Sequence, residues 1–422
     1  MSKVPAGWEV KNLGDIATVT SGGTPSRDNI EYWNGAIPWV RTTEVKNCPL
    51  YYNDIKEFIT EDGLKNSSAK LVPENSVLIA MIGQGKTRGQ VAILKLPACT
   101  NQNCGIAIFD SNSDADFYFQ FLLSQYEAIR KFSNSAGQSN LSGALLKKIT
   151  MPVPPLPEQT KIAQILSTWD KAIATTEQLI GNSQQQKKAL MQSLLTGKKR
   201  LPGFEKLNEY QTTRYGKIPL DWGFKQIDDI AKNISIKNKE GKDYPVLSCS
   251  KHSGFIDSLK YFNKKVYSDN TSGYKIIKKG WFGFPSNHIE EGSIGLQDLY
   301  EVGIVSPIYI IFGVNEKFIS SLYLYALFKT DHYKQIFSAS TNASVDRRGS
   351  LRWDEFGKIK VPVPSLPEQQ KIAQILTAAD NEIELLQKKL VFLKQEKTAL
   401  MQQLLTGKRR VKINATEECM DA

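Results

Sequence analysis

A segment of 51 residues occurs twice in this chain, and no other feature constrains its fold as strongly. Residues 151–201 and 361–411 align without a gap at a constant offset of 210, and about half of their positions are identical. An internal repeat of this kind divides the chain into two tandem halves that share one plan. Each half opens around Trp8 or Trp222, continues with a mixed region of roughly 130 residues, and closes with the repeated segment.

The repeated segment predicts one long α-helix in each half. Pro157 and Glu158 suit a first helical turn, because proline lacks no needed donor there and a carboxylate faces the positive end of the helix dipole. Gly197, followed by three cationic residues, suits a helix stop, and the second copy repeats both signals. Between the signals, a 4,3 spacing defines a seam at Ile162, Leu166, Trp169, Ile173, Thr176, Ile180, Ser183, Lys187, Leu190 and Leu194 in the first copy, and at Ile372, Leu376, Ala379, Ile383, Leu386, Leu390, Leu393, Lys397, Leu400 and Leu404 in the second. A period of 3.5 residues sustained this long predicts a left-handed coiled coil, with a long helix on a globular core as the alternative.

We expect the two helices to pair with each other in an antiparallel arrangement. The middle of the first helix is polar at Thr176 and Ser183, whereas the second helix has leucines there. Pairing of the first helix with a copy of itself would therefore bury hydroxyl groups together. The predicted register places Ile162 opposite Leu404, Trp169 opposite Lys397, Thr176 opposite Leu390, and Lys187 opposite Ala379.

The mixed regions have the pattern of an α+β fold, with short β-branched runs separated by turns rich in glycine and asparagine. Strands are predicted at Ile37–Val40, Val77–Ile82, Gln90–Leu94 and Gly105–Phe109, and at Tyr244–Leu247, Trp281–Phe284 and Ile304–Phe312. One amphipathic helix is predicted near the end of each region, at Asp116–Phe132 and at Phe318–Phe337. Since the two regions share little sequence between their opening and closing parts, we interpret them as one scaffold with different surfaces.

Composition narrows the setting and the partners. The net charge of +11 indicates a polyanionic partner, although no segment is a polybasic tail. Five cysteines are scattered without a CxxC pair, so neither a disulfide framework nor a zinc site is expected. The N-terminal sequence lacks the apolar stretch of a signal peptide, and the most apolar run, Gly303–Val314, is too short to span a bilayer. We therefore expect a cytoplasmic protein without membrane contact.

Catalytic motifs are weak or missing. The [ND]PP[YF] box of DNA-base methyltransferases is absent, and the nuclease-type triplets Glu44–Lys46, Asp54–Lys56 and Glu240–Lys242 follow no convincing acidic strand end. The three histidines all lie in the second half, which excludes a symmetric histidine-based site. Residues 80–87 resemble a phosphate-binding P-loop, but the next residues predict a turn and a strand rather than the helix that a P-loop needs.

A hairpin tip at residues 84–88 is the better interpretation of that sequence, and it would present side chains suited to DNA. Glutamine can bond adenine at two points, and arginine or lysine can bond guanine or phosphate. The same chemistry recurs in other loops. The candidate DNA-binding residues are Thr24, Arg27, Arg41, Gln84, Lys86, Arg88, Gln102, Asn103, Gln138, Ser139, Asn140, Ser250, Lys251, His252, Asn287, His288, Asn342, Arg347 and Arg348.

The repeated LPEQxKIAxIL…ALMQxLLTGKxR segment closely resembles the conserved regions of type I restriction–modification specificity subunits. The opening GWEVKNLGDIATVTSGGTPS…YWNGAIPWVRT resembles their target recognition domains. The resemblance covers nearly the whole chain, but the second mixed region lacks the SGGTPS loop and the IPW strand.

The resemblance implies a non-catalytic subunit whose two recognition domains each read one half of a bipartite, asymmetric sequence in double-stranded DNA. It implies recognition domains at 1–150 and 218–360, helical spacers at 151–201 and 361–411, a linker at 202–217 and a tail at 412–422. Two modification subunits and the restriction subunits would be the protein partners, and S-adenosylmethionine, ATP and Mg²⁺ would belong to them, with no cofactor in this chain. The alternatives are a protein-binding coiled-coil scaffold and a recognition module of a methyltransferase or nuclease.

Overall fold

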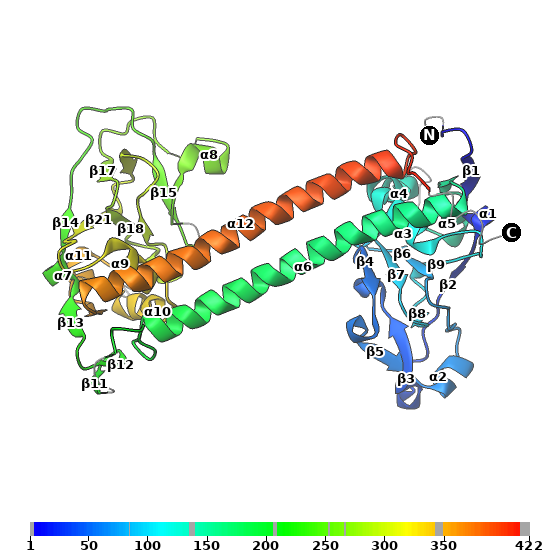
Figure 1. Cartoon of the computed structure of the whole chain (residues 1–422), viewed down its shortest axis with the longest axis horizontal. Coiled ribbons are helices and arrows are strands. Elements are labelled where there is room, and N and C mark those ends of the chain that lie inside the picture. Colours follow the sequence, from blue (N-terminus) through cyan, green and yellow to red (C-terminus); the bar gives the residue numbers. More distant parts are fainter. Residues whose placement is uncertain are drawn as a thin grey trace. The chain divides into compact units, whose positions relative to one another are not determined.

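The computed structural model describes residues 4–83, 85–134, 140–205, 209–251, 254–265, 267–341 and 349–413. The chain divides into two compact units, each built from one mixed region and parts of both long helices (Figure 1). Unit 1 comprises Met1–Glu177 and Lys388–Ala422, and unit 2 comprises Gln178–Gln387.

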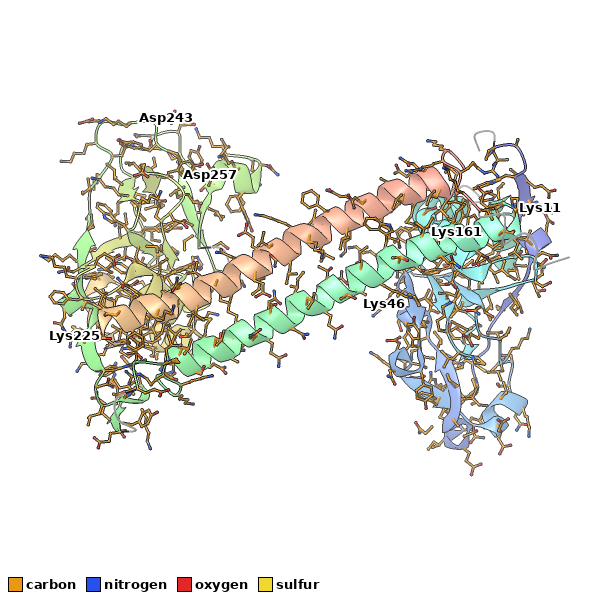
Figure 2. All side chains as sticks on the ribbon, viewed as in Figure 1. Lys11, Lys46, Lys161, Lys225, Asp243 and Asp257 are labelled. Atoms are coloured by element: carbon orange, nitrogen blue, oxygen red, sulfur yellow. The ribbon has the colours of Figure 1, made fainter. Side chains whose placement is uncertain are left out.

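The repeated segments form the two predicted helices, α6 (Leu156–Leu194) and α12 (Leu366–Leu404), each of 39 residues. All twenty predicted seam positions are buried or half-buried. Between Leu376 and Leu400 of α12, all residues that are not seam positions are exposed. Side chains outside the seam extend outward along both helices (Figure 2). The heptad prediction is therefore confirmed.

Contacts inside each unit confirm the antiparallel pairing and its register. In unit 1, Ile162 and Leu404 belong to one apolar cluster, and the Lys397 ammonium lies 2.5 Å from Asp170, next to Trp169. In unit 2, Leu194 and Ile372 share a cluster, and Lys187 forms an ion pair with Asp380, next to Ala379.

Both helix ends have the predicted glycine stop. Gly197 and Gly407 have φ angles of +68° and +70°, in the left-handed region that other residues rarely adopt. A Cβ atom on Gly197 would lie 2.4 Å from Cγ of Pro219, and one on Gly407 would lie 2.5 Å from Cγ of Pro5. The missing side chain of each glycine therefore also lets the opening segment of a mixed region pack closely against the end of the helix.

Unit 1 contains a five-stranded sheet in the order β2-β9-β6-β7-β4, a three-stranded sheet β5-β3-β8 and the antiparallel pair β1-β10. The strands are β1 (Glu9–Asn12), β2 (Ala17–Ser21), β3 (Trp33–Val40), β4 (Cys48–Leu50), β5 (Glu57–Ile59), β6 (Val77–Ala80), β7 (Val91–Leu94), β8 (Cys99–Thr100), β9 (Cys104–Phe109) and β10 (Thr150–Val153). The helices are α1 (Leu13–Ile16), α2 (Glu61–Lys65), α3 (Ala115–Ser124), α4 (Tyr126–Asn134) and α5 (Gly143–Lys147).

Unit 2 repeats the central part of this sheet. Its four-stranded sheet β14-β21-β18-β19 matches β2-β9-β6-β7 in order and in antiparallel pairing. The strands are β11 (Tyr210–Thr213), β12 (Gly216–Pro219), β13 (Gly223–Gln226), β14 (Ala231–Ile234), β15 (Leu247–Ser250), β16 (Gly254–Asp257), β17 (Lys275–Lys278), β18 (Phe282–Pro285), β19 (Gly295–Leu296), β20 (Val302–Val305), β21 (Tyr309–Val314) and β22 (Lys360–Val363). The helices are α7 (Ile227–Ile230), α8 (Ser258–Phe262), α9 (Ser321–Phe328), α10 (Asp331–Ser340) and α11 (Trp353–Phe356).

Each mixed region is locked to the start of a long helix by one glutamine. The Gln159 side chain accepts a hydrogen bond from the backbone N–H of Asp114, which caps α3, and donates one to the carbonyl of Pro154. Gln369 makes the equivalent bonds with Ser320, which caps α9, and with Pro364. Both bridging bonds at backbone N–H groups measure 2.8 Å. These contacts give the repeated glutamine of the LPEQ motif a structural role.

Two helix predictions for the mixed regions need correction. The helix predicted at Asp116–Phe132 is two helices, α3 and α4, and the one predicted at Phe318–Phe337 is α9 and α10. In the second case Thr330 caps the new helix by accepting the N–H of Tyr333, and this local cap ends the continuous apolar pattern.

Two strand predictions were also wrong in their bounds. The run Ile304–Phe312 is two strands, β20 and β21, because the turn containing Pro307 interrupts it. The strand predicted at Tyr244–Leu247 begins only at Leu247, while Val246 forms an isolated bridge to Ile304.

Candidate nucleic-acid interface

The candidate residues of unit 1 converge at one end of its sheets. Strand pairing places the last residues of β2 and β6 beside the first residues of β9 and β7, with Ser21 opposite Gly105 and Ala80 opposite Cys104. The parallel pair β3 and β8 ends there too, since Val40 pairs with Thr100. We call this edge the loop end of unit 1. Four loops meet at it, formed by residues 22–29, 41–47, 101–103 and the described part of 81–90.

Close backbone packing joins two of these loops. A Cβ on Gly22 would lie 2.0 Å from the Thr100 carbonyl oxygen, and one on Gly23 would lie 2.2 Å from the Ser68 carbonyl carbon. The approach brings the Thr24 hydroxyl to donate a hydrogen bond to the Gln102 side chain. The Gly-Gly pair of the SGGTPS loop thus assembles two candidate residues that lie far apart in the sequence.

Arg27 and Arg41 meet at a single carboxylate, that of Glu57 at the start of β5. Nη2 of Arg27 donates to Oε2 of Glu57 at 2.6 Å, and Nη2 of Arg41 donates to Oε1. The Arg27 guanidinium lies over the ring of Trp33, 3.6 Å from its centroid. The two arginine side chains are about half exposed, at 49% and 48%, whereas Glu57 is only 19% exposed.

Side chains of α4 hold the hairpin between β6 and β7 by hydrogen bonds to its backbone. The Tyr126 hydroxyl donates to the carbonyl of Lys86 at 2.6 Å, and Arg130 donates to the carbonyl of Gly85 at 2.8 Å. The Lys86 side chain is exposed and Arg88 is half-buried. Since β7 follows the turn at Val91, the prediction that this sequence is a hairpin tip and not a P-loop is confirmed.

The remaining candidates of unit 1 border the same hairpin. The backbone of Asn103 accepts a hydrogen bond from the N–H of Met81 at 3.0 Å. The carbonyl of Met81 accepts from the N–H of Leu141 at 2.9 Å, which places the exposed Asn140 beside the hairpin. All described candidates of the first half therefore lie at the loop end.

Unit 2 has an equivalent loop end, where β14 and β18 finish and β21 and β19 begin. Asn287 and His288 follow β18 after Ser286, and His288 Nδ1 lies 3.6 Å from Glu291. Leu351 donates its N–H to the Ser286 carbonyl at 2.8 Å, as Leu141 does to the Met81 carbonyl in unit 1. In each unit the acceptor is the first residue after the strand, β18 or β6.

Lys329 joins the other candidates of unit 2 to this loop. Its ammonium donates to the carbonyls of Lys251 and Gly292 at 3.0 and 3.1 Å, so the β15–β16 turn with Ser250 and Lys251 lies beside the 286–294 loop. Burial lowers the pKa of Lys329. A cation thus holds main-chain carbonyls at this loop end, as Arg130 does in unit 1.

Seven candidates fall outside the described residues: Gln84, Gln138, Ser139, His252, Asn342, Arg347 and Arg348. Sequence reasoning also missed four residues at the loop end of unit 1: Lys46, Glu57, Tyr126 and Arg130. Lys46 is exposed in the loop after β3 and could have been found from the same signal as Arg41, a polar loop after a predicted strand. Tyr126 and Arg130 lie four residues apart on one helical face, but their target depends on tertiary packing.

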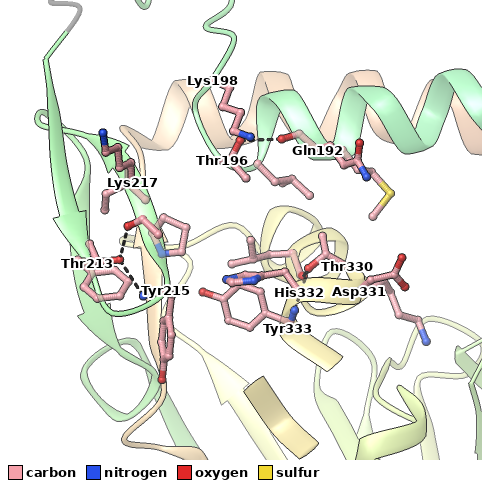
Figure 3. A pocket seen from close by; sticks show the side chains of 18 of the residues that line it. Gln192, Thr196, Lys198, Thr213, Tyr215, Lys217, Thr330, Asp331, His332 and Tyr333 are labelled. Carbon is pink, nitrogen blue, oxygen red and sulfur yellow. Dashed lines mark hydrogen bonds between the residues drawn. The ribbon is translucent and has the colours of Figure 1, made fainter. Parts of the chain in front are cut away.

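A separate pocket of about 1060 Å³ lies within unit 2, among the end of α6, the β11–β12 hairpin and the turn between α9 and α10 (Figure 3). Its lining residues include the aromatic side chains of Tyr215, Phe224 and Tyr333 and the cationic side chains of Lys198 and Lys217. Within the described ranges, no cluster of histidine, cysteine and acidic side chains is arranged to hold a metal ion. No described helix is long and apolar enough to cross a membrane.

Comparison with known proteins agrees with this architecture. The family model described as "Type I restriction modification DNA specificity domain" matches residues 5–182 and again residues 219–395. The type I restriction enzyme MjaIX specificity subunit of Methanocaldococcus jannaschii is 26% identical, over 97% of this chain and 95% of that protein. The EcoR124I/EcoR124II specificity subunit of Escherichia coli is 32% identical over 38% of this chain and 41% of its own length.

Among solved structures, the S subunit of a type I restriction–modification system from M. genitalium matches 98% of both chains, with a TM-score of 0.57 and 18% identity. The match extends the likeness of fold to nearly the full length. Two tandem mixed regions with two long helices define the architecture of a DNA specificity protein. The chain belongs to the type I restriction–modification DNA specificity domain family.

Proposed function

We propose that this chain is the DNA specificity subunit of a type I restriction–modification complex, and that each mixed region reads one half of a bipartite, asymmetric target. The observation that carries the proposal is the repeated scaffold with different loops. The same four strands, in the same order and pairing, end in polar loops in both units, but the loop sequences differ. Two different surfaces on one scaffold suit two different half-sites.

The loop end of unit 1 has the chemistry of a DNA-reading surface. Exposed arginine and lysine side chains can contact phosphates or guanine, and amide side chains such as Gln102 can bond base edges. Helix α4 and the glycine contacts hold these loops in place, so the donors are positioned before DNA binds. The readers in this proposal are residues 1–150 and 218–360.

The paired helices serve as the spacer between the two readers and as the docking platform for partner subunits. In this proposal the chain is non-catalytic and cytoplasmic. Two modification subunits supply adenine methylation with S-adenosylmethionine, and restriction subunits supply ATP hydrolysis and cleavage with Mg²⁺. This chain carries no cofactor of its own.

Binding to DNA in the presence of the modification subunit tests the proposal. We expect a sequence-selective mobility shift whose affinity falls steeply between 50 and 200 mM salt, since phosphate contacts release counterions. Equal affinity for all sequences, or no shift at any salt concentration, would instead favour a scaffold that binds only protein.

Incubation of the purified chain alone with DNA, Mg²⁺ and S-adenosylmethionine tests the non-catalytic assignment. We expect neither methylated nor cleaved DNA, and both products only after the partner subunits are added. Methylation or cleavage by the chain alone would show that it is an enzyme with unrecognised motifs.

A further inference from the structure

We propose that Arg27 and Arg41, oriented together by Glu57, form a reading site for one guanine in the half-site contacted by unit 1. The inference rests on the proposed function and assigns to it a base and a positioning residue. Two half-exposed arginines share one mostly buried carboxylate at the loop end. Neither the family match nor the prediction of DNA-binding loops accounts for this shared carboxylate.

The geometry leaves donors available for a base. Glu57 accepts one bond from Nη2 of each arginine. A guanidinium carries five N–H donors in a rigid fork, so either arginine retains enough donors for the two bonds that O6 and N7 of guanine accept. Lysine, with one rotatable ammonium, cannot present such a fork.

The surroundings fix the orientation of the arginines. Glu57 lies opposite Trp39 in the β3–β5 pair, and Trp39 Nε1 donates to the Gly23 carbonyl at 3.0 Å. The rings of Trp33 and Trp39 pack edge to face, with centroids 5.1 Å apart, and Arg27 stacks on the first of them. The strand register, the glycine loop and the aromatic pair thus hold the guanidinium planes before any DNA arrives.

The charge balance also favours a positioning role for Glu57. Arg27, Arg41 and Glu57 together carry a net charge of +1. A carboxylate beside DNA repels phosphates, and both oxygens of Glu57 already accept hydrogen bonds from the arginines, so its contribution to recognition comes from the orientation of Arg27 and Arg41. A guanine edge presents two acceptors and no phosphate charge, which suits oriented arginines at a site of modest positive charge.

The test uses the full chain assembled with its modification subunit and a library of randomised double-stranded DNA, from which bound sequences are selected and read. For Glu57→Gln we expect discrimination at one G·C pair of one half-site to fall roughly 5- to 150-fold, the value of one bidentate contact. Affinity for random DNA should stay the same or rise, because a negative charge is lost. A merely structural role would lower selective and random binding together.

Three further variants keep the test decisive. Arg27→Lys and Arg41→Lys both keep the charge, and the one at the arginine that bonds the base should relax the same G·C pair. Together they decide the question if Glu57→Gln does not fold. Glu9→Gln is the matched control, since Glu9 also pairs with a cation, Lys11 at 2.7 Å, but lies on β1. The control should select the wild-type motif.

Three outcomes are distinguishable. If Glu57→Gln, Arg27→Lys and Arg41→Lys all select the wild-type motif at every position, the guanine site is refuted while the proposed function stands. If they relax an A·T pair instead, the assignment to guanine is refuted. If the wild-type complex selects no motif at all, the proposed function itself fails.

Discussion

Glu158 and Glu368 occupy equivalent places in the first turns of α6 and α12, and each pairs with the arginine that follows the other helix. Arg410 donates two hydrogen bonds to Glu158, at 2.6 and 2.7 Å, and Arg200 donates two to Glu368, at 2.6 and 2.9 Å. The tryptophan of each opening segment adds a third bond to the same carboxylate. Three basic residues follow each helix stop, and the last of the three, Arg200 or Arg410, pairs with the first turn of the other long helix.

Replacing Arg200 should therefore destabilise unit 2. The side chains of Arg200 and Glu368 are only 10% and 2% exposed, and Arg200→Met would leave the carboxylate buried without its cation. We expect a loss of about 3 kcal/mol in the free energy of unfolding, measured by urea denaturation. Lys188→Met is the control, because Lys188 pairs with Asp331 at 3.5 Å with both side chains about two-thirds exposed, and should change stability by less than about 0.5 kcal/mol. Equal losses of stability in the two variants would contradict a stabilising role of the buried Arg200–Glu368 ion pair.

At the scale of elements, the sequence was informative where structure is set locally. The heptad and the stop at Gly197 predicted both long helices nearly to the residue, because seam burial and helix capping act over one or two turns. The breaks at Gln125 and Thr330 were missed, since an apolar pattern continues across each of them. The candidate loops could be predicted from polar residues after strands. Glu57 could not, because its position between two arginines depends on the register of β3 and β5.

The helix pair itself offers a sharper prediction at Asp170. This carboxylate accepts a bond from the Lys397 ammonium at 2.5 Å and from the Gln120 amide of α3 at 2.6 Å, so it joins α12 to the mixed region. Lys397 is 8% exposed. Asp170→Ala should lower the free energy of unfolding by about 3 kcal/mol, measured by urea denaturation, because the buried Lys397 ammonium loses its ion-pair partner.

A double variant separates pairing from packing at this point. Adding Lys397→Met to Asp170→Ala should recover most of the lost stability, because an apolar side chain of similar length then fills the seam. The exposed ion pair of Glu177 and Lys394 provides the control, and its removal should lower the free energy of unfolding by no more than about 1 kcal/mol. If the double variant is less stable than Asp170→Ala alone, the buried ion pair is not the reason for the loss.

A matched insertion tests the spacer role of the helices. Seven residues inserted after Thr176 and seven more after Leu390, its seam partner, keep the heptad frame and lengthen each helix by about 10 Å at 1.5 Å per residue. This length corresponds to about three base-pair steps of 3.4 Å. We expect the undefined stretch between the half-sites to lengthen while both half-sites stay unchanged, as measured by selection from randomised DNA. An insertion in one helix alone should abolish selection, and altered half-sites would argue against a spacer.

At the scale of the whole molecule, each compact unit takes its mixed region from one half of the chain and its helices from both. Unit 1 contains the last part of α12, and unit 2 contains the last part of α6. The repeated residues therefore act across the two halves, as the Glu158–Arg410 and Glu368–Arg200 pairs show. The hydrogen bonds given above for the described residues of the loop ends each stay within one half of the chain. Recognition surfaces can thus differ between the halves while the repeated segments stay alike.

Exchange of one mixed region should for this reason change one half-site only. Replacing residues 1–150 by the corresponding region of another family member keeps α6, α12 and all of unit 2, provided that the donor supplies equivalents of Trp8 and Asp114, which contact Glu158 and Gln159. Because the donor then brings its own loop end, the selected DNA should contain one new half-site, one unchanged half-site and the original spacing. The reciprocal exchange of residues 218–360 should change the other half-site. If either exchange altered both half-sites, the two units would not read DNA independently, and the loops could not be assigned to separate halves of the target.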